Sequence, residues 1–89
     1  MDIAAFERKL GDDGFIEIET KSYAPRPANG DHGHHFSVRG LILDGAFTVA
    51  IEGIPRCYRA GEMFEVAEGV IHNEAVGPEG ARIMVGRKY

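Results

Sequence analysis

Hydrophobic and polar residues alternate with two different periods along this chain. The first segment carries apolar residues at the spacing of one helical face, namely Ile3, Phe6 and Leu10. Asp2 is a suitable N-cap and Gly11 a suitable stop, so we expect one short helix within residues 1–11. From Phe15 onward the period changes to two, which is typical of strands.

Short apolar runs separated by turn residues continue to the end of the chain. Asp44 and Gly45 form a strong two-residue hairpin signal, and Glu52 and Gly53 favour the next turn. Further turns are expected at residues 59–61, 67–69 and 77–80. About seven short strands with turns every eight to ten residues or so predict an all-β sandwich or barrel.

Composition and length limit the possible functions. A chain of 89 residues with 44% hydrophobic residues is expected to form one domain, residues 1–89. At this length folding buries only about 60 to 65% of the unfolded surface, so a bound metal or dimerisation would add stability. The net charge of −4, without a basic patch, argues against nucleic acid and anionic membranes as partners.

Cysteine usage and hydropathy bear on where the protein works. The chain has one cysteine, Cys57, which excludes an intramolecular disulfide. No apolar run is long enough for a signal peptide or a membrane span. We therefore expect a soluble, cytoplasmic protein, with Cys57 buried on its strand rather than reactive.

All four histidines lie in two short segments of the chain. His32 and His34 are two residues apart, so in an extended strand they project from the same face. His72 could supply a third nitrogen, and three neutral imidazoles suit zinc, iron, nickel or copper. His35 would lie on the opposite face of the strand, where it would either face solvent or hydrogen-bond to a metal ligand. A bulge in the strand would exchange the roles of His34 and His35. Solvated loop histidines without a ligand are the ordinary alternative.

The spacing of six residues in these segments resembles that of the cupin family. The family pairs a His-any-His motif and a later glycine with a second motif of spaced glycines and a histidine. The matching residues are His32, His34, Gly45, Gly61, Gly69 and His72. The resemblance covers residues 30–86 and implies an all-β, RmlC-like jelly-roll barrel (a double-stranded β-helix) after a short N-terminal helix. It also implies that the three histidines bind one divalent metal ion: zinc, iron, nickel, manganese or copper.

The chain also departs from the cupin pattern. The carboxylate of the first motif falls at Val38 or Arg39, and neither side chain can bind a metal. The proline and asparagine of the second motif are replaced by Ala67 and Val76. The chain thus resembles a three-histidine cupin, similar in ligand set to the thiol dioxygenases. A neutral ligand set leaves the full double charge on the metal, which favours an anionic substrate or a bound hydroxide.

Two further residues are candidates for the site. Glu74 lies two residues after His72 and shares its face, so it is the candidate replacement carboxylate or general base. A glutamate on the surface near a strand end is the commoner alternative. Arg39 could hold a substrate carboxylate at the barrel mouth, although an exposed arginine in a salt bridge is more common.

The predicted barrel leaves room only for a small ligand. Its expected lining residues are Phe36, Val38, Ile42, Phe47, Val49, Phe64, Val66 and Ile83. One function consistent with this pattern is a metal-dependent enzyme in which Glu74 or a metal-bound hydroxide moves protons. A non-catalytic module that binds a metal or small ligand is the alternative, and a barrel with vestigial histidines is a third hypothesis.

We also expect a homodimer. The apolar stripe of Phe15, Ile16 and Ile18, together with the helix face, offers more nonpolar surface than one small barrel is expected to bury. A symmetric pair is the commonest way to cover such a surface, and the cupin resemblance implies the same.

Overall fold

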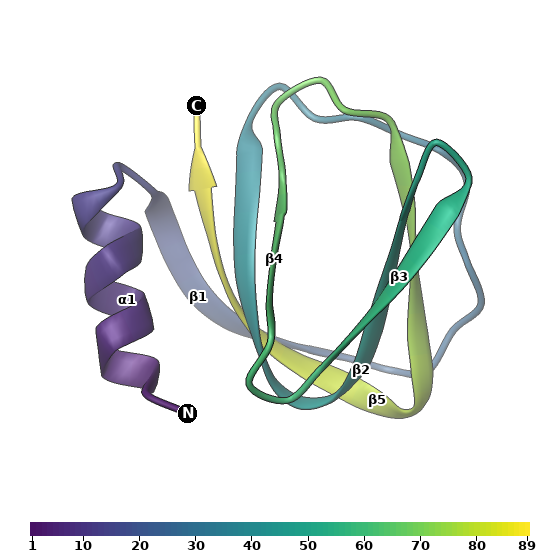
Figure 1. Cartoon of the computed structure of the whole chain (residues 1–89), viewed down its shortest axis with the longest axis horizontal. Helices are drawn as coiled ribbons and strands as arrows, with labels where there is room; N and C mark the ends of the chain where they lie inside the picture. The colour runs from purple at the N-terminus through teal and green to yellow at the C-terminus, as the bar shows by residue number, and fades with distance from the viewer.

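The computed structural model describes residues 1–89 and contains one helix and a five-stranded antiparallel sheet. The elements are α1 (Ile3–Asp12), β1 (Ile16–Tyr23), β2 (Ser37–Ile51), β3 (Ile54–Arg59), β4 (Met63–Val66) and β5 (His72–Lys88). The strand order is β1-β5-β2-β3, and β4 pairs with β2. The sheet curves into a barrel with α1 outside it (Figure 1), which confirms the all-β prediction with one N-terminal helix.

The expected hairpin at Asp44 and Gly45 is wrong, because β2 continues through both residues to Ile51. The register between β2 and β5 shifts on either side of this point, so the glycine lies in an irregular bend of a long strand. The expected turn at residues 77–80 is likewise part of β5. Pairing along the whole length of a partner strand outweighs local turn propensity here, and five strands replace the expected seven or so.

The bend depends on close contact between two glycines. Gly45 and Gly80 both have a φ of +78°, a conformation that disfavours residues with a side chain. A Cβ on Gly45 would collide with the backbone oxygen of Gly80. These two glycines therefore allow β2 and β5 to remain paired while both strands curve.

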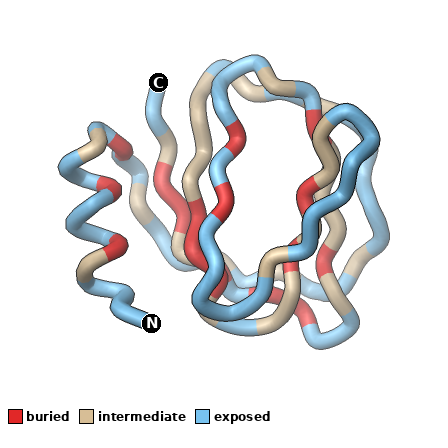
Figure 2. The backbone as a smooth tube through the Cα atoms, viewed as in Figure 1, coloured by how far each residue is buried: buried red, intermediate tan, exposed pale blue.

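The interior of the barrel holds most of the core. Its buried hydrophobic residues are Ile42, Phe47, Val49, Phe64, Val66, Val76, Ala81, Ile83 and Val85. Six of the eight predicted lining residues are in this group, whereas Phe36 and Val38 are half-buried. Figure 2 shows the buried positions on the walls of the barrel and on the face of α1 that meets the sheet.

A second, smaller cluster lies between the helix and the sheet. Phe6, Leu10 and Phe15 are buried there against Leu41. The nonpolar surface that we expected a partner chain to cover is therefore largely covered within one chain, because α1 packs on the outside of the barrel. Ile3 and Ile16 remain 41% and 55% exposed.

The ends of α1 are determined by side-chain contacts. The Asp2 carboxylate accepts a hydrogen bond from the amide of Ala5, which confirms the N-cap. The expected stop at Gly11 is wrong by a short distance, since the helix includes Gly11 and ends at Asp12. The next residue, Asp13, accepts from Lys9 at 3.0 Å and from Arg39 at 2.5 Å.

Two residues singled out in the sequence lie outside the barrel. Arg39 pairs with Asp13 and with Glu65, the latter at 2.6 Å, and so joins α1 to β2 and β4. Cys57 is exposed, contrary to our expectation. Its strand, β3, pairs only with β2, and it is the neighbouring Tyr58 that packs against the core. No helix has the length and apolar character needed to cross a membrane.

The glycines predict an unequal response to alanine. Gly53 has a φ of +75°, and a Cβ added there would meet nothing within 4 Å, so Gly53→Ala should cost about 1–2 kcal/mol of backbone strain alone. Gly45→Ala adds the collision with Gly80 and should cost about 3 kcal/mol or more. Urea unfolding of both variants measures this, and equal losses would contradict the close contact of β2 and β5.

The ion pair at the end of α1 predicts a pH-dependent stability. Hydrogen bonds from Arg39 and then Lys9 hold the pKa of Asp13 below its ordinary value of 3.8. The ionised Asp13 carboxylate therefore contributes fully to the free energy of unfolding above its ordinary pKa. This contribution is lost as the pH falls through the lowered pKa of the folded state. The difference in unfolding free energy between the native chain and Asp13→Asn should shrink between pH values of about 5 and 3.

The control for this measurement is the same substitution in an Arg39→Met background. Without the main cause of the lowered pKa, the shrinkage on acidification should be smaller. A shrinkage that is identical in the two backgrounds would show that Arg39 does not stabilise the Asp13 carboxylate.

Candidate metal centre

The segment between β1 and β2 carries two of the histidines and runs antiparallel to the start of β5. Arg26 exchanges two backbone hydrogen bonds with Val76, at 3.2 and 3.0 Å. Six residues later, His32 exchanges two with His72, both at 2.9 Å. Prolines in this segment cannot donate to a ladder, so the pairing stays intermittent rather than forming a strand. His32 and His72 nevertheless lie directly opposite each other.

The structure brings three histidines together. The ring centroids of His32 and His72 are 4.5 Å apart. The ring centroid of His34 lies 5.1 Å from that of His32 and 5.3 Å from that of His72. One ligand nitrogen from each ring lies within 4.8 Å of the other two. His72 is 2% exposed, whereas His32 and His34 are half-buried. His35 is exposed and lies outside the cluster, as expected.

Backbone carbonyls determine which nitrogens are free in two of these rings. The Nδ1 of His72 donates to the oxygen of Val70 at 2.9 Å, and the Nδ1 of His32 donates to that of Gly30 at 2.9 Å. A carbonyl can only accept, so each Nδ1 carries the hydrogen and each neutral ring keeps a lone pair on Nε2. Hydrogen bonds of this kind are the usual support of metal-binding histidines.

The third ring is favoured in its neutral form. Burial, and then the neighbouring His32 and His72, lower the pKa of His34 below its ordinary value. Its ring also stacks on Phe36 at 4.8 Å with an interplanar angle of 12°. A neutral imidazole is the form that binds a metal, so the environment of His34 suits a ligand.

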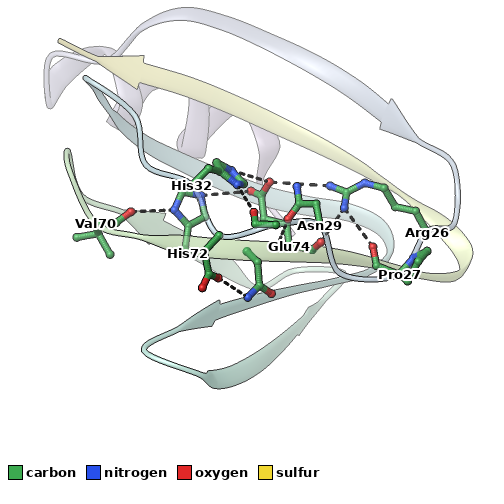
Figure 3. A network of polar contacts seen from close by, with 10 residues as sticks. Arg26, Pro27, Asn29, His32, Val70, His72 and Glu74 are labelled. Atoms are coloured by element: carbon green, nitrogen blue, oxygen red, sulfur yellow. Dashed lines mark hydrogen bonds and ion pairs between the residues drawn. The ribbon is translucent and has the colours of Figure 1, made fainter.

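Glu74 lies beside the cluster rather than on the open surface. Its carboxylate oxygens are 3.8 Å from the Nε2 of His32 and 3.9 Å from the Nε2 of His72. Its side chain is 22% exposed. Figure 3 shows His32, His72 and Glu74 together, with Arg26 beyond the glutamate. The two free Nε2 atoms and a carboxylate thus face a common region.

Sequence reasoning missed the two residues that hold the backbone of Glu74. The guanidinium of Arg26 donates to the Glu74 carbonyl at 2.6 Å, and the Glu74 amide donates to the side chain of Asn29 at 2.8 Å. Arg26, Asn29 and His32 recur at every third position of their segment. That spacing is the only signal in the sequence, and it does not reveal their partners on β5.

A small cavity in the barrel adjoins the cluster. Its volume is about 180 Å³, below the roughly 300–1,000 Å³ of sites for drug-sized ligands. Its polar lining residues are Lys21, His32, His34, Glu74 and Arg87. Burial raises the pKa of the Tyr23 phenol, also in the wall, so this group remains a neutral hydrogen-bond donor. The cavity suits a small molecule that contacts the histidines at one end.

Solved structures share this architecture, although no protein-family model and no curated protein matches the sequence. A cupin-2 domain protein of Shewanella frigidimarina is similar over 81% of this chain and 69% of its own, with 19% identity and a TM-score of 0.68. An RmlC-like cupin from the same organism is similar over 78% and 61%, with 22% identity and a TM-score of 0.64. The fold is that of a cupin.

The EutQ protein of Clostridium difficile is similar to a larger part of this chain. The similarity covers 89% of this chain and 60% of that one, with 16% identity and a TM-score of 0.71. At these identities the comparisons establish the fold that the sequence motifs predicted. Since a cupin barrel carries many different chemistries, the activity has to be argued from the residues of this chain.

Proposed function

We propose that this cupin binds one divalent metal ion through His32, His34 and His72. The observation that carries the proposal is the pair of Nδ1–H bonds to the oxygens of Gly30 and Val70, which leaves two Nε2 lone pairs beside a third neutral imidazole. A three-nitrogen site of this kind suits zinc, iron, nickel, manganese or copper and keeps positions open for a ligand.

The proposed activity is that of a metal-dependent enzyme acting on a small, anionic molecule. A bound divalent ion would supply Lewis-acid chemistry, and three neutral ligands would leave its full double charge to attract an anion. Glu74 is the proposed acid–base residue, because its carboxylate lies 3.8 and 3.9 Å from two of the imidazoles and borders the cavity. Arg26 and Asn29 hold its backbone in position.

The homodimer expected from the sequence remains part of the proposal, although α1 covers most of the apolar surface that first suggested it. β1 ends the strand order and pairs only with β5, so its outer edge is free. Ile16 at the start of β1 is 55% exposed. Pairing of two β1 edges about a twofold axis would cover both features.

We predict that His72→Ala abolishes stoichiometric metal binding in a folded protein of lower melting temperature. Removing a residue that only hydrogen-bonds to a metal ligand typically weakens metal binding by roughly 10- to 100-fold. Removing His72, a direct ligand, should weaken it by more. His35→Ala is the matched control, because this exposed histidine lies outside the cluster. Elemental analysis of tag-free protein, with chelator competition, measures occupancy. Full occupancy in His72→Ala, or loss in His35→Ala, would show that the ligand set is wrong.

Light scattering tests the dimer. The native chain should have about twice its chain mass of 9.7 kDa, and Ile16→Glu should shift the mass towards 9.7 kDa. The control is Ile54→Glu, which places the same charge on the opposite edge strand, β3, where Ile54 is 71% exposed. A native mass near 9.7 kDa would rule out the dimer, and equal effects of the two variants would rule out the β1 interface.

A further inference from the structure

Two cationic side chains occupy positions that face the interior of the barrel. Alternate residues of a strand share a face, and Lys21 lies in the same row of β1 as Tyr23. On β5, Arg87 continues the row of Ile83 and Val85. All five of these residues line the cavity. Their side chains are 34% and 36% exposed, so both cations line the cavity and remain accessible to an anion from solvent.

The acidic neighbours of these cations are exposed side chains outside the cavity. The ammonium of Lys21 forms an ion pair with Glu19 at 3.2 Å, whereas the Nη1 of Arg87 lies 3.8 Å from Glu17, beyond hydrogen-bond distance. Glu19 and Glu17 are 54% and 52% exposed, and neither lines the cavity. Exposed pairs of this kind contribute little, so an anion inside the cavity can compete with them.

Phe36 places Arg87 near the histidine cluster. The guanidinium carbon of Arg87 lies 4.8 Å from the centre of the Phe36 ring, and the same ring stacks on His34 at 4.8 Å. Arg87 and His34 thus both lie against the Phe36 ring. Aliphatic and aromatic side chains form the rest of the wall: Tyr23, Phe36, Val38, Phe47, Phe64, Ile83 and Val85.

We propose that Lys21 and Arg87 bind the carboxylate of a small aliphatic acid whose other end contacts the histidine cluster. A guanidinium and an ammonium are the groups that recognise a carboxylate, and the apolar wall suits a short carbon chain. Because the Glu74 carboxylate already lies beside the histidines, the proposal places the ligand carboxylate at the two cations and an uncharged polar group at the cluster. This inference rests on the proposed function for the role of the cluster and specifies its substrate class.

Butyrate and butyramide are suitable probes, because they differ in charge and have the same size. Both are titrated into the full chain, zinc-loaded and again with a chelator, while the amide signals are followed by NMR. Butyrate should bind about tenfold more tightly than butyramide in both forms, with shifts at the cavity. Lys21→Met and Arg87→Met should each remove most of this preference. Arg59→Met, which neutralises an exposed cation outside the cavity, should not.

Three results would overturn the inference. The first is equal binding of butyrate and butyramide to the native chain. This measurement does not depend on whether any variant folds. The second is an undiminished preference in both Lys21→Met and Arg87→Met. The third is a preference that disappears with the chelator, because the carboxylate would then bind the metal instead. Zinc stoichiometry is measured on the same samples, so failure of the metal site would be seen separately from failure of the carboxylate site.

Discussion

β5, the longest strand of the barrel, has hydrogen-bonded partners along both of its edges. β2 pairs with it from His72 to Lys88, and β1 pairs with its second half. The segment that precedes β2 pairs with its first half, at Val76 and His72. Because backbone donors and acceptors must find partners in a buried sheet, both edges of β5 are occupied by different parts of the chain. The position of the histidines follows from this arrangement.

The candidate metal centre consists of a cross-strand pair of histidines and a third histidine beside it. His32 faces His72 because their backbones exchange two hydrogen bonds, and His34 joins them from two residues further along the same segment. The carbonyls of Gly30 and Val70 each lie two residues before the histidine they orient. Ring orientation is therefore set by local backbone geometry, which a small protein can provide without a large supporting shell.

The interior of this small barrel is divided between a packed core and a cavity. One part is filled by packed hydrophobic side chains, whereas the region beside the histidines contains a cavity of about 180 Å³ with charged residues in its wall. Each inward-facing charge removes a position from the core. The second cluster, around Phe6, Leu10 and Phe15, supplies additional buried surface outside the barrel. α1 thus offsets part of the cost of the cavity.

The sequence by itself determined the all-β class, the N-terminal helix with its Asp2 cap, and the three histidines as candidates. These features depend on periodicity and spacing, which are local properties of the chain. The turn at Glu52 and Gly53 was also predictable, since Glu52 and Gly53 both adopt positive φ between β2 and β3. Local signals misled at Asp44 and Gly45, where a hairpin dipeptide lies inside a strand.

Only the tertiary structure decided which residues meet. Two sets of contacts join residues that are distant in sequence: that of Gly45 with Gly80, and those of Arg26 and Asn29 with Glu74. The exposure of Cys57 depends on strand order, because its strand β3 lies at the edge of the sheet. The same holds for Lys21 and Arg87, whose inward orientation depends on the register of β1 and β5. Strand register is set by long-range pairing, because a shift of one residue reverses the face of every side chain. Residue spacing along the chain therefore cannot predict it.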